Sequence, residues 1–132
     1  MTELSNLKTG VNGSRKVLES EGLPAAVKLL DAAIEEAVRQ GWTRSVQTLC
    51  CHAAVLCQFA ENPPLRRHYY ELSLFHSPAN YCALYGLAKV CLEEGQTAPA
   101  RLYAKQSYEV IMASHDPLAH SLLDLIELSW QR

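Results

Sequence analysis

Cys50, Cys51 and His52 form the one cluster of adjacent side chains in this sequence that could do nucleophilic chemistry. A thiol becomes a nucleophile when a nearby base or a helix N-terminus favours its thiolate form. On a helix, however, adjacent residues point about 100° apart, so being neighbours does not align Cys51 with His52. We therefore expect no catalysis from this cluster. A thiol-based redox enzyme is therefore the least favoured of the three functional interpretations given below.

The chain has five cysteines, an odd number, and no Cys-x-x-Cys pair. The residues from Met1 to Leu4 lack the basic start and apolar core of a signal peptide. Without an export signal, the cysteines are expected to be reduced thiols, mostly buried, that act as small apolar side chains. The sequence therefore predicts a cytoplasmic protein.

Other sites for chemistry are sparse. His115, His120 and Asp124 do not form a tight helical set of metal ligands. The sequence has no phosphate-binding loop, Gly-rich dinucleotide turn or Ser-centred elbow. We predict no bound metal and no cofactor.

The composition is that of a soluble globular protein, with 48% hydrophobic and 20% charged residues. A net charge of −2 without a basic run gives no electrostatic reason for binding nucleic acid or an anionic membrane. No apolar stretch approaches the roughly 20 residues that span a bilayer. The length of 132 residues predicts a single domain over residues 1–132.

Apolar residues recur at three- or four-residue intervals along the chain, and no alternating strand pattern lasts long enough to compete. Glycines at positions 22, 41 and 95 are predicted to end helices, and Asn62 before Pro63 marks a helix start. Thr43 and Thr97 are predicted N-caps. The predicted helices cover residues 4–20, 24–40, 44–60, 63–76, 79–94, 98–113 and 116–132.

Three of these helices carry specific expectations. The first is predicted to be the weakest, because Gly10 and Gly13 lie inside it and each costs about 1 kcal/mol relative to Ala. In the second, Val38 is expected to join a broad buried face, and Leu102 is expected to point inward from the sixth. The predicted fold is all-α, with antiparallel hairpins over residues 4–40, 43–76 and 79–113 and a C-terminal helix over 116–132.

The middle of the chain matches itself when shifted by 34 residues. The matching pairs are Ala54 with Ala88, Cys57 with Cys91, Arg67 with Arg101, Tyr69 with Tyr103 and Ser73 with Ser107. A period of this length is typical of stacked helical hairpins, in which each unit has an apolar face that only its neighbours can cover.

In period and pattern the chain resembles the tetratricopeptide repeat (TPR) family. The clearest unit begins at Tyr81 and matches the family's pattern at Leu84, Leu87, Ala88, Cys91, Gly95, Ala100, Ala104 and Ser107, while Met112 replaces the family's Pro. A second unit begins at Gln47, and an earlier hairpin matches mainly in its second helix. The resemblance implies a short right-handed α-solenoid of about three TPR-like hairpins.

The resemblance also implies a function. In the family, the first helix of each hairpin lines a concave groove that holds an extended segment or a helix of another protein. The first interpretation is therefore a non-catalytic adaptor, assembly factor or chaperone that binds a partner protein of unknown identity. The implied groove residues are Lys8, Arg15, Cys51, Val55, Phe59, Tyr85, Lys89 and Leu92.

The last helix suggests the second interpretation, a structural homo-oligomer such as a homodimer. Its apolar arc is wide for the terminal helix of a stack, which should present a polar back to water. The candidate interface residues are Leu118, Leu122, Leu123, Ile126 and Trp130.

Overall fold

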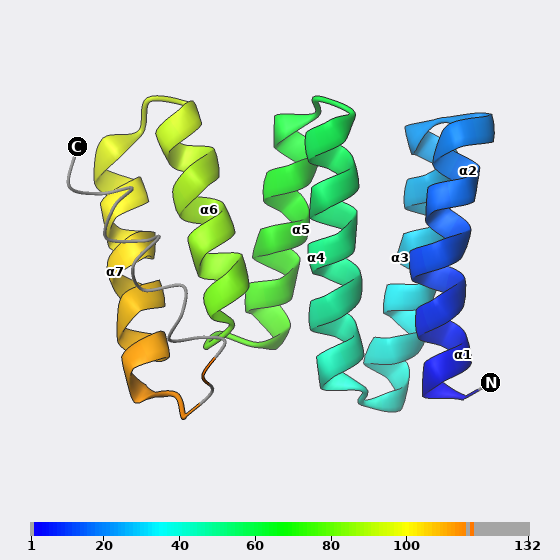
Figure 1. The fold of residues 1–132 in the computed structure, drawn as a ribbon, viewed down its shortest axis with the longest axis horizontal. Coiled ribbons are helices and arrows are strands. Elements are labelled where there is room, and N and C mark those ends of the chain that lie inside the picture. Colours follow the sequence, from blue (N-terminus) through cyan, green and yellow to red (C-terminus); the bar gives the residue numbers. More distant parts are fainter. Residues whose placement is uncertain (1, 116, 118–132) are drawn as a thin grey trace. The chain divides into compact units, whose positions relative to one another are not determined.

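The structure is a computed structural model that describes residues 2–115 and residue 117 (Figure 1). These residues form helices and the turns that connect them, and they contain no strand. The prediction of an all-α fold is confirmed. Within this part of the chain, every helix is too short or too polar to cross a lipid bilayer.

The helices divide between two compact units, one covering residues 1–77 and one beginning at Pro78. The first unit contains α1 (Glu3–Lys8), η1 (Thr9–Gly13), α2 (Ser14–Glu21), α3 (Leu23–Gln40), α4 (Thr43–Phe59) and α5 (Pro63–His76). The second contains α6 (Tyr81–Glu93) and α7 (Thr97–Ala113). These bounds agree closely with the predicted helices up to residue 113.

Local signals place most helix ends correctly. Gly41 ends α3 in the left-handed conformation at φ 74°, which is strained for a residue with a Cβ atom. Asn62 caps α5, where its side chain accepts a hydrogen bond from the Leu65 backbone N–H at 3.2 Å. The predicted caps at Thr43 and Thr97 are wrong. Both threonines are the first residues of their helices, and neither of these helices has a side-chain cap hydrogen bond.

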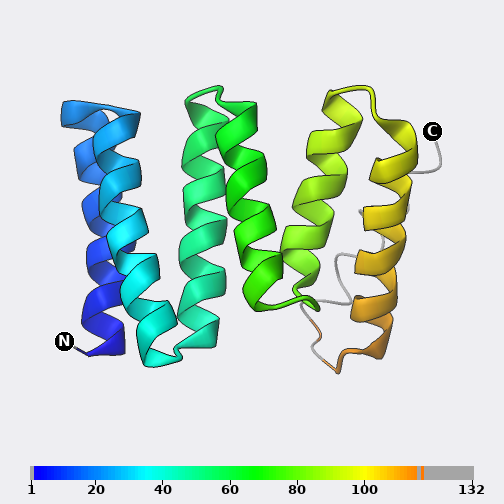
Figure 2. The ribbon, with the colours of Figure 1, turned by 180° about the vertical axis from the view of Figure 1, so that it is seen from behind.

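The core of the first unit is built around α4, which packs against both α3 and α5. Cys50, Ala53, Ala54 and Cys57 are fully buried on α4, and Tyr69 of α5 is fully buried beside them. Small side chains let neighbouring helix axes approach closely, and the large Tyr69 ring fills the remaining space. In Figure 2, α3 and α5 face the viewer on either side of α4.

The first helix is continuous from Glu3 to Glu21, but its middle is a π-helical segment, η1. A Cβ atom built on Gly10 would lie 2.5 Å from Leu49 Cδ2 and 3.0 Å from Ala33 Cβ. Gly10 therefore allows this helix to lie directly against α3 and α4. The glycine that weakens the isolated helix is required by its packing.

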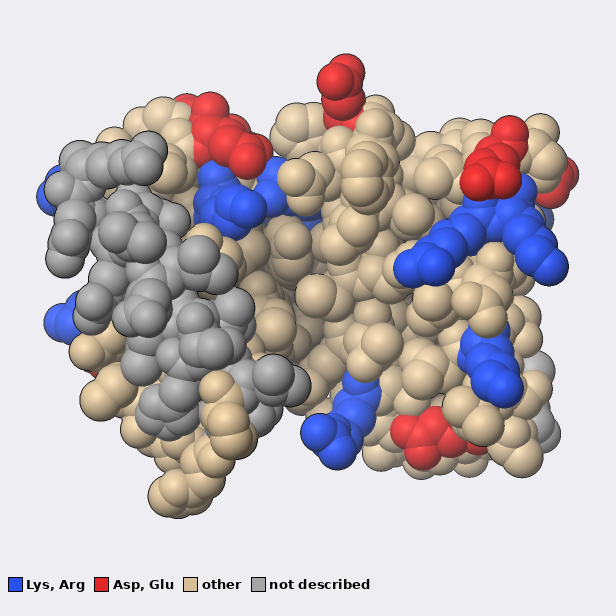
Figure 3. All heavy atoms as spheres, in the orientation of Figure 1, with Lys and Arg blue, Asp and Glu red and all other residues tan. Residues whose placement is uncertain are grey.

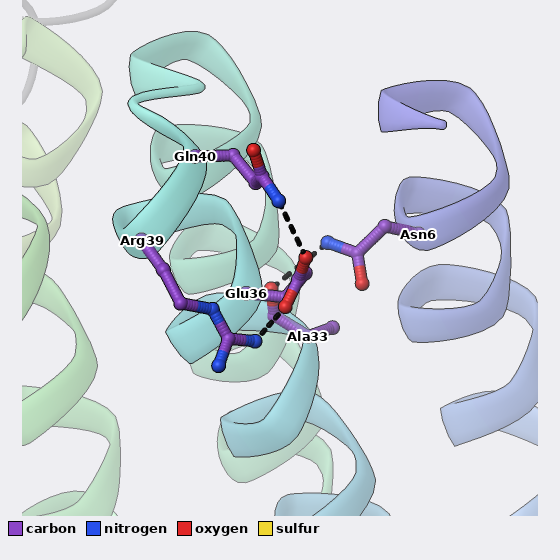
Figure 4. Close-up of polar contacts among 5 residues, drawn as sticks. All are labelled: Asn6, Ala33, Glu36, Arg39 and Gln40. Carbon is purple, nitrogen blue, oxygen red and sulfur yellow. Dashed lines mark hydrogen bonds and ion pairs between the residues drawn. The ribbon is translucent and has the colours of Figure 1, made fainter. Parts of the chain in front are cut away.

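Buried polar side chains hold α1 in place. The Asn6 side-chain amide donates a hydrogen bond to the Ala33 carbonyl oxygen of α3 at 2.9 Å (Figure 4). The Ser45 hydroxyl of α4 donates to Glu3 Oε1 at 2.7 Å. Because Asn6 and Ser45 are both buried, these bonds satisfy groups that would otherwise be desolvated without a partner.

The second unit is a hairpin in which α6 packs against α7. The buried Ser107 hydroxyl donates to the Tyr81 carbonyl oxygen at 3.1 Å and so links α7 to the first residue of α6. Leu102 is 56% exposed, so its predicted inward direction is wrong. The predicted burial of Val38 in the first unit is also wrong, because this side chain is exposed.

The predicted C-terminal interface lies outside the described residues. This applies to Leu118, Leu122, Leu123, Ile126 and Trp130 and, apart from residue 117, to the helix predicted over residues 116–132. The single-domain organisation also stays a prediction, and the two units are described separately.

Candidate functional site

One side of α4 lies opposite the residues that it packs into the core, and it carries most of the groove residues predicted in the first unit. Cys51, His52, Val55 and Phe59 fall within a roughly 100° arc of the helix, opposite the residues that pack into the core. Val55 is 40% exposed and Phe59 is 79% exposed. We call these four residues the α4 face.

Arg15 of α2 lies beside the α4 face, close enough to His52 for its charge to act on the imidazole. Figure 3 shows basic side chains over α1 and α2, whereas the surface over α4 is mostly uncharged. The first unit thus offers exposed apolar side chains next to cationic ones.

His52 connects the α4 face to the first helix. Its Nε2 atom lies 3.1 Å from the hydroxyl oxygen of the buried Ser14, which itself donates to the Val11 carbonyl oxygen at 3.1 Å. Because the Ser14 hydroxyl already donates its hydrogen bond to Val11, it can only accept from His52. This arrangement fits the His52 tautomer in which Nε2–H donates to Ser14. Burial, and then the Arg15 charge, lower the pKa of His52 and favour the neutral ring.

The thiols beside His52 lie in surroundings that oppose ionisation. Burial, followed by the charges of Cys51 and Asp31, raises the pKa of Cys50 to about 12. Burial also raises the pKa of Cys51 above its ordinary value. A nucleophilic thiol requires the opposite shift. These shifts oppose a nucleophilic role for Cys50 and Cys51, and none of the five cysteines forms a disulfide.

We expect thiol labelling to follow burial. With an aromatic disulfide reagent at neutral pH, Cys82 should react in the native protein because it is exposed. Cys50, Cys57 and Cys91 are fully buried and should react only after a denaturant is added. The reaction is followed by stopped-flow absorbance. A kinetic phase that is missing in Cys82→Ser or in Cys51→Ser is assigned to the cysteine that was replaced. A Cys51 phase faster than that of an unstructured cysteine peptide would contradict this interpretation.

Lys8 is exposed on α1, but its relation to Arg15 differs from the one implied by a regular helix. The π-helical segment η1 lies between them and widens one turn by a residue. Two residues seven positions apart on an α-helix share a face, whereas the π segment rotates them relative to each other. Sequence periodicity contained no signal for this change.

The second unit carries the remaining predicted groove residues on α6. Tyr85, Lys89 and Leu92 share one side of this helix, opposite its buried residues. The Lys89 ammonium lies 5.8 Å from the centroid of the half-buried Tyr85 ring, a cation–π distance. Leu92 is exposed. The structure therefore brings these three together on α6, as it brings Cys51, Val55 and Phe59 together on α4.

A groove that the sequence did not predict lies between α3 and α5 and has a volume of about 470 Å³. It is lined by Asp31, Ile34, Glu35, Val38, Arg39, His68, Leu72 and His76. Within the part of the chain that the structure describes, no three His, Cys, Asp or Glu side chains could hold a metal ion together. The groove is thus a candidate for a peptide or an organic group.

No protein-family model matches the chain, and no curated protein matches it.

Proposed function

We propose that this chain is a non-catalytic protein-interaction module, an adaptor, assembly factor or chaperone, that binds a peptide or helix of a partner protein. In this proposal its hairpins form a short, right-handed, TPR-like solenoid, and the first helices of the hairpins line the binding groove. The proposed compartment is the cytoplasm, where the five thiols would stay reduced.

The observation that carries the proposal is the exposure of large apolar side chains on the α4 face. Phe59 leaves 79% of its surface in water and Val55 leaves 40%, although both lie on a helix whose other side is fully packed. Exposed aromatic side chains surrounded by polar groups are typical anchors of protein interfaces. The cationic Arg15 beside them adds a group that orients a partner rather than one that reacts.

Replacing Phe59 by Asp should abolish partner capture without unfolding the protein. Loss of an aromatic anchor costs about 2 kcal/mol of binding free energy or more, which is about a thirtyfold loss of affinity. Stability should change little, because the side chain contributes almost nothing to the core. The measurement is recovery of cross-linked partners from source cells, with helix content checked by far-UV circular dichroism.

Phe75→Asp is the matched control, since Phe75 is 80% exposed but lies on α5. It should leave capture unchanged. Equal losses in both variants, or capture that survives Phe59→Asp, would show that the α4 face does not bind the partner.

A Tyr85→Ala substitution tests whether the partner also contacts α6, as the proposed solenoid requires. If one segment of the partner spans the first helices of two hairpins, Tyr85→Ala and Phe59→Asp should weaken capture of the same protein. Capture unaffected by Tyr85→Ala would limit the binding surface to the first unit.

A further inference from the structure

The groove between α3 and α5 has an apolar floor and a charged wall. Ile34 and Val38 of α3 and Leu72 of α5 supply apolar surface, of which Val38 is exposed and Leu72 is half-buried. The wall on α3 also carries the carboxylates of Asp31 and Glu35, one helical turn apart. None of these residues belongs to the α4 face.

Asp31 is held in a fixed position from inside the protein. The hydroxyl of the fully buried Tyr69 donates a hydrogen bond to Asp31 Oδ1 at 2.7 Å. This short bond uses one carboxylate oxygen, and Oδ2 has no hydrogen-bond partner among the described residues. A carboxylate that is already oriented loses little conformational entropy when a second donor binds to it.

The groove is lined by two carboxylates, those of Asp31 and Glu35, and by one guanidinium. Among the described residues that line it, Arg39 is the only Lys or Arg, beside His68 and His76, and its guanidinium forms an ion pair with Glu36 (Figure 4). Gln40 also donates to Glu36, at 3.0 Å, so this carboxylate has two partners on its own helix. Glu35, by contrast, forms no hydrogen bond or ion pair with any described residue. Asp31 and Glu35 together therefore remain available to a cation.

We propose that the α3–α5 groove is a second binding surface, for a helical segment of another protein that carries a Lys or Arg and an apolar residue on one side. The cation would meet Asp31 and Glu35, and the apolar side chain would cover Val38 and Leu72. Burial of apolar surface supplies binding free energy, and the charge pairing selects the partner and its direction.

The positions of the two contacts set the spacing in the partner. Asp31 and Val38 are seven residues apart on α3, or about 10 Å along the helix axis. A partner helix lying along the groove would therefore present its cation and its apolar residue seven positions apart. The two surfaces therefore differ in which molecule supplies the cation. In the groove the partner supplies it, whereas at the α4 face the protein supplies it through Arg15.

The test uses the full chain and two synthetic peptides. Both are alanine-based helices of about 20 residues with a Leu seven positions from the variable residue, which is Arg in one and Glu in the other. Binding is followed by amide chemical shifts. We expect the Arg peptide to shift resonances of α3 and α5 and to bind about three- to tenfold more tightly than the Glu peptide. Salt should reduce this preference.

Charge-removing variants locate the effect. Glu35→Gln should reduce the preference for the Arg peptide, whereas Glu71→Gln, which changes an exposed carboxylate of α5 outside the groove lining, should not. Equal affinities for the two peptides, or the absence of shifts in α3 and α5, would overturn the proposal. Failure here would leave the α4-face experiment with Phe59→Asp unaffected, since the two surfaces share no residue.

Discussion

Raising the pH from about 9 to about 11 is expected to destabilise this protein by several kcal/mol, because burial raises the pKa of two thiols in its core. Burial raises the pKa of Cys57 from an ordinary value of 9.0 to about 11, and that of Cys50 to about 12. Above pH 9 the unfolded chain loses these protons while the folded chain keeps them. The contribution of these two thiols to stability is therefore fully present below pH 9 and is lost as the pH rises towards their folded pKa values.

The size of this effect follows from the two shifts. Each pH unit between the unfolded and folded pKa costs about 1.4 kcal/mol per group, so the two thiols together cost roughly 3 to 5 kcal/mol near pH 11. Folded domains have about 5 to 15 kcal/mol of stability, so a transition to the unfolded state is expected in this range. Tyr69 adds to the loss at higher pH, because burial and its bond to Asp31 raise the pKa of its hydroxyl.

Urea unfolding at a series of pH values, under reducing conditions, measures this slope directly. The control is the double variant Cys50→Ala, Cys57→Ala. It should be less stable than the wild type at neutral pH, because it leaves small cavities, but should lose less further stability between pH 8 and about 11. Parallel curves for the two proteins would show that the buried thiols do not cause the alkaline loss.

Replacing Gly10 by Ala is expected to destabilise the protein by about 1 to 2 kcal/mol, although Ala is the better helix former. The new Cβ atom would lie 2.5 Å from Leu49 Cδ2 and 3.0 Å from Ala33 Cβ. Leu49 is fully buried and Ala33 nearly so, which leaves neither room to move aside. The cost of overpacking therefore exceeds the gain of up to about 1 kcal/mol in helix propensity.

Gly13 lies in the same π-helical segment and provides the matched control. A Cβ atom there would meet only Leu29 Cδ2, at 2.9 Å, and Leu29 is half-buried, so its side chain can rotate towards solvent. Gly13→Ala should therefore be neutral or slightly stabilising. Thermal unfolding followed by circular dichroism compares the two variants, and effects of the same sign and size would refute the packing explanation for Gly10.

The candidate site was predictable to different degrees in its parts. Val55 and Phe59 were candidates because the TPR resemblance implies groove positions there, and both are exposed on the side of α4 opposite its buried residues. The lining of the α3–α5 groove was not predictable. Val38 belongs to an apolar stripe by spacing, yet it is exposed, and no helix among the described residues covers it. Periodicity predicts which way a side chain points but not which element lies against it.

The sequence by itself determined the elements of this protein, since helix periodicity, glycines such as Gly41 and the Asn62 cap act between residues a few positions apart. Tertiary structure alone decided three features. They are the close approach of the first helix to α3 and α4 at Gly10, the hydrogen bond from Tyr69 to Asp31, and the α3–α5 groove. These contacts join residues separated by more than 20 positions, and their free energy depends on which helices lie together. The spacing of residues along one helix does not indicate which helices pack together, because an apolar helix face has the same pattern whichever neighbour covers it.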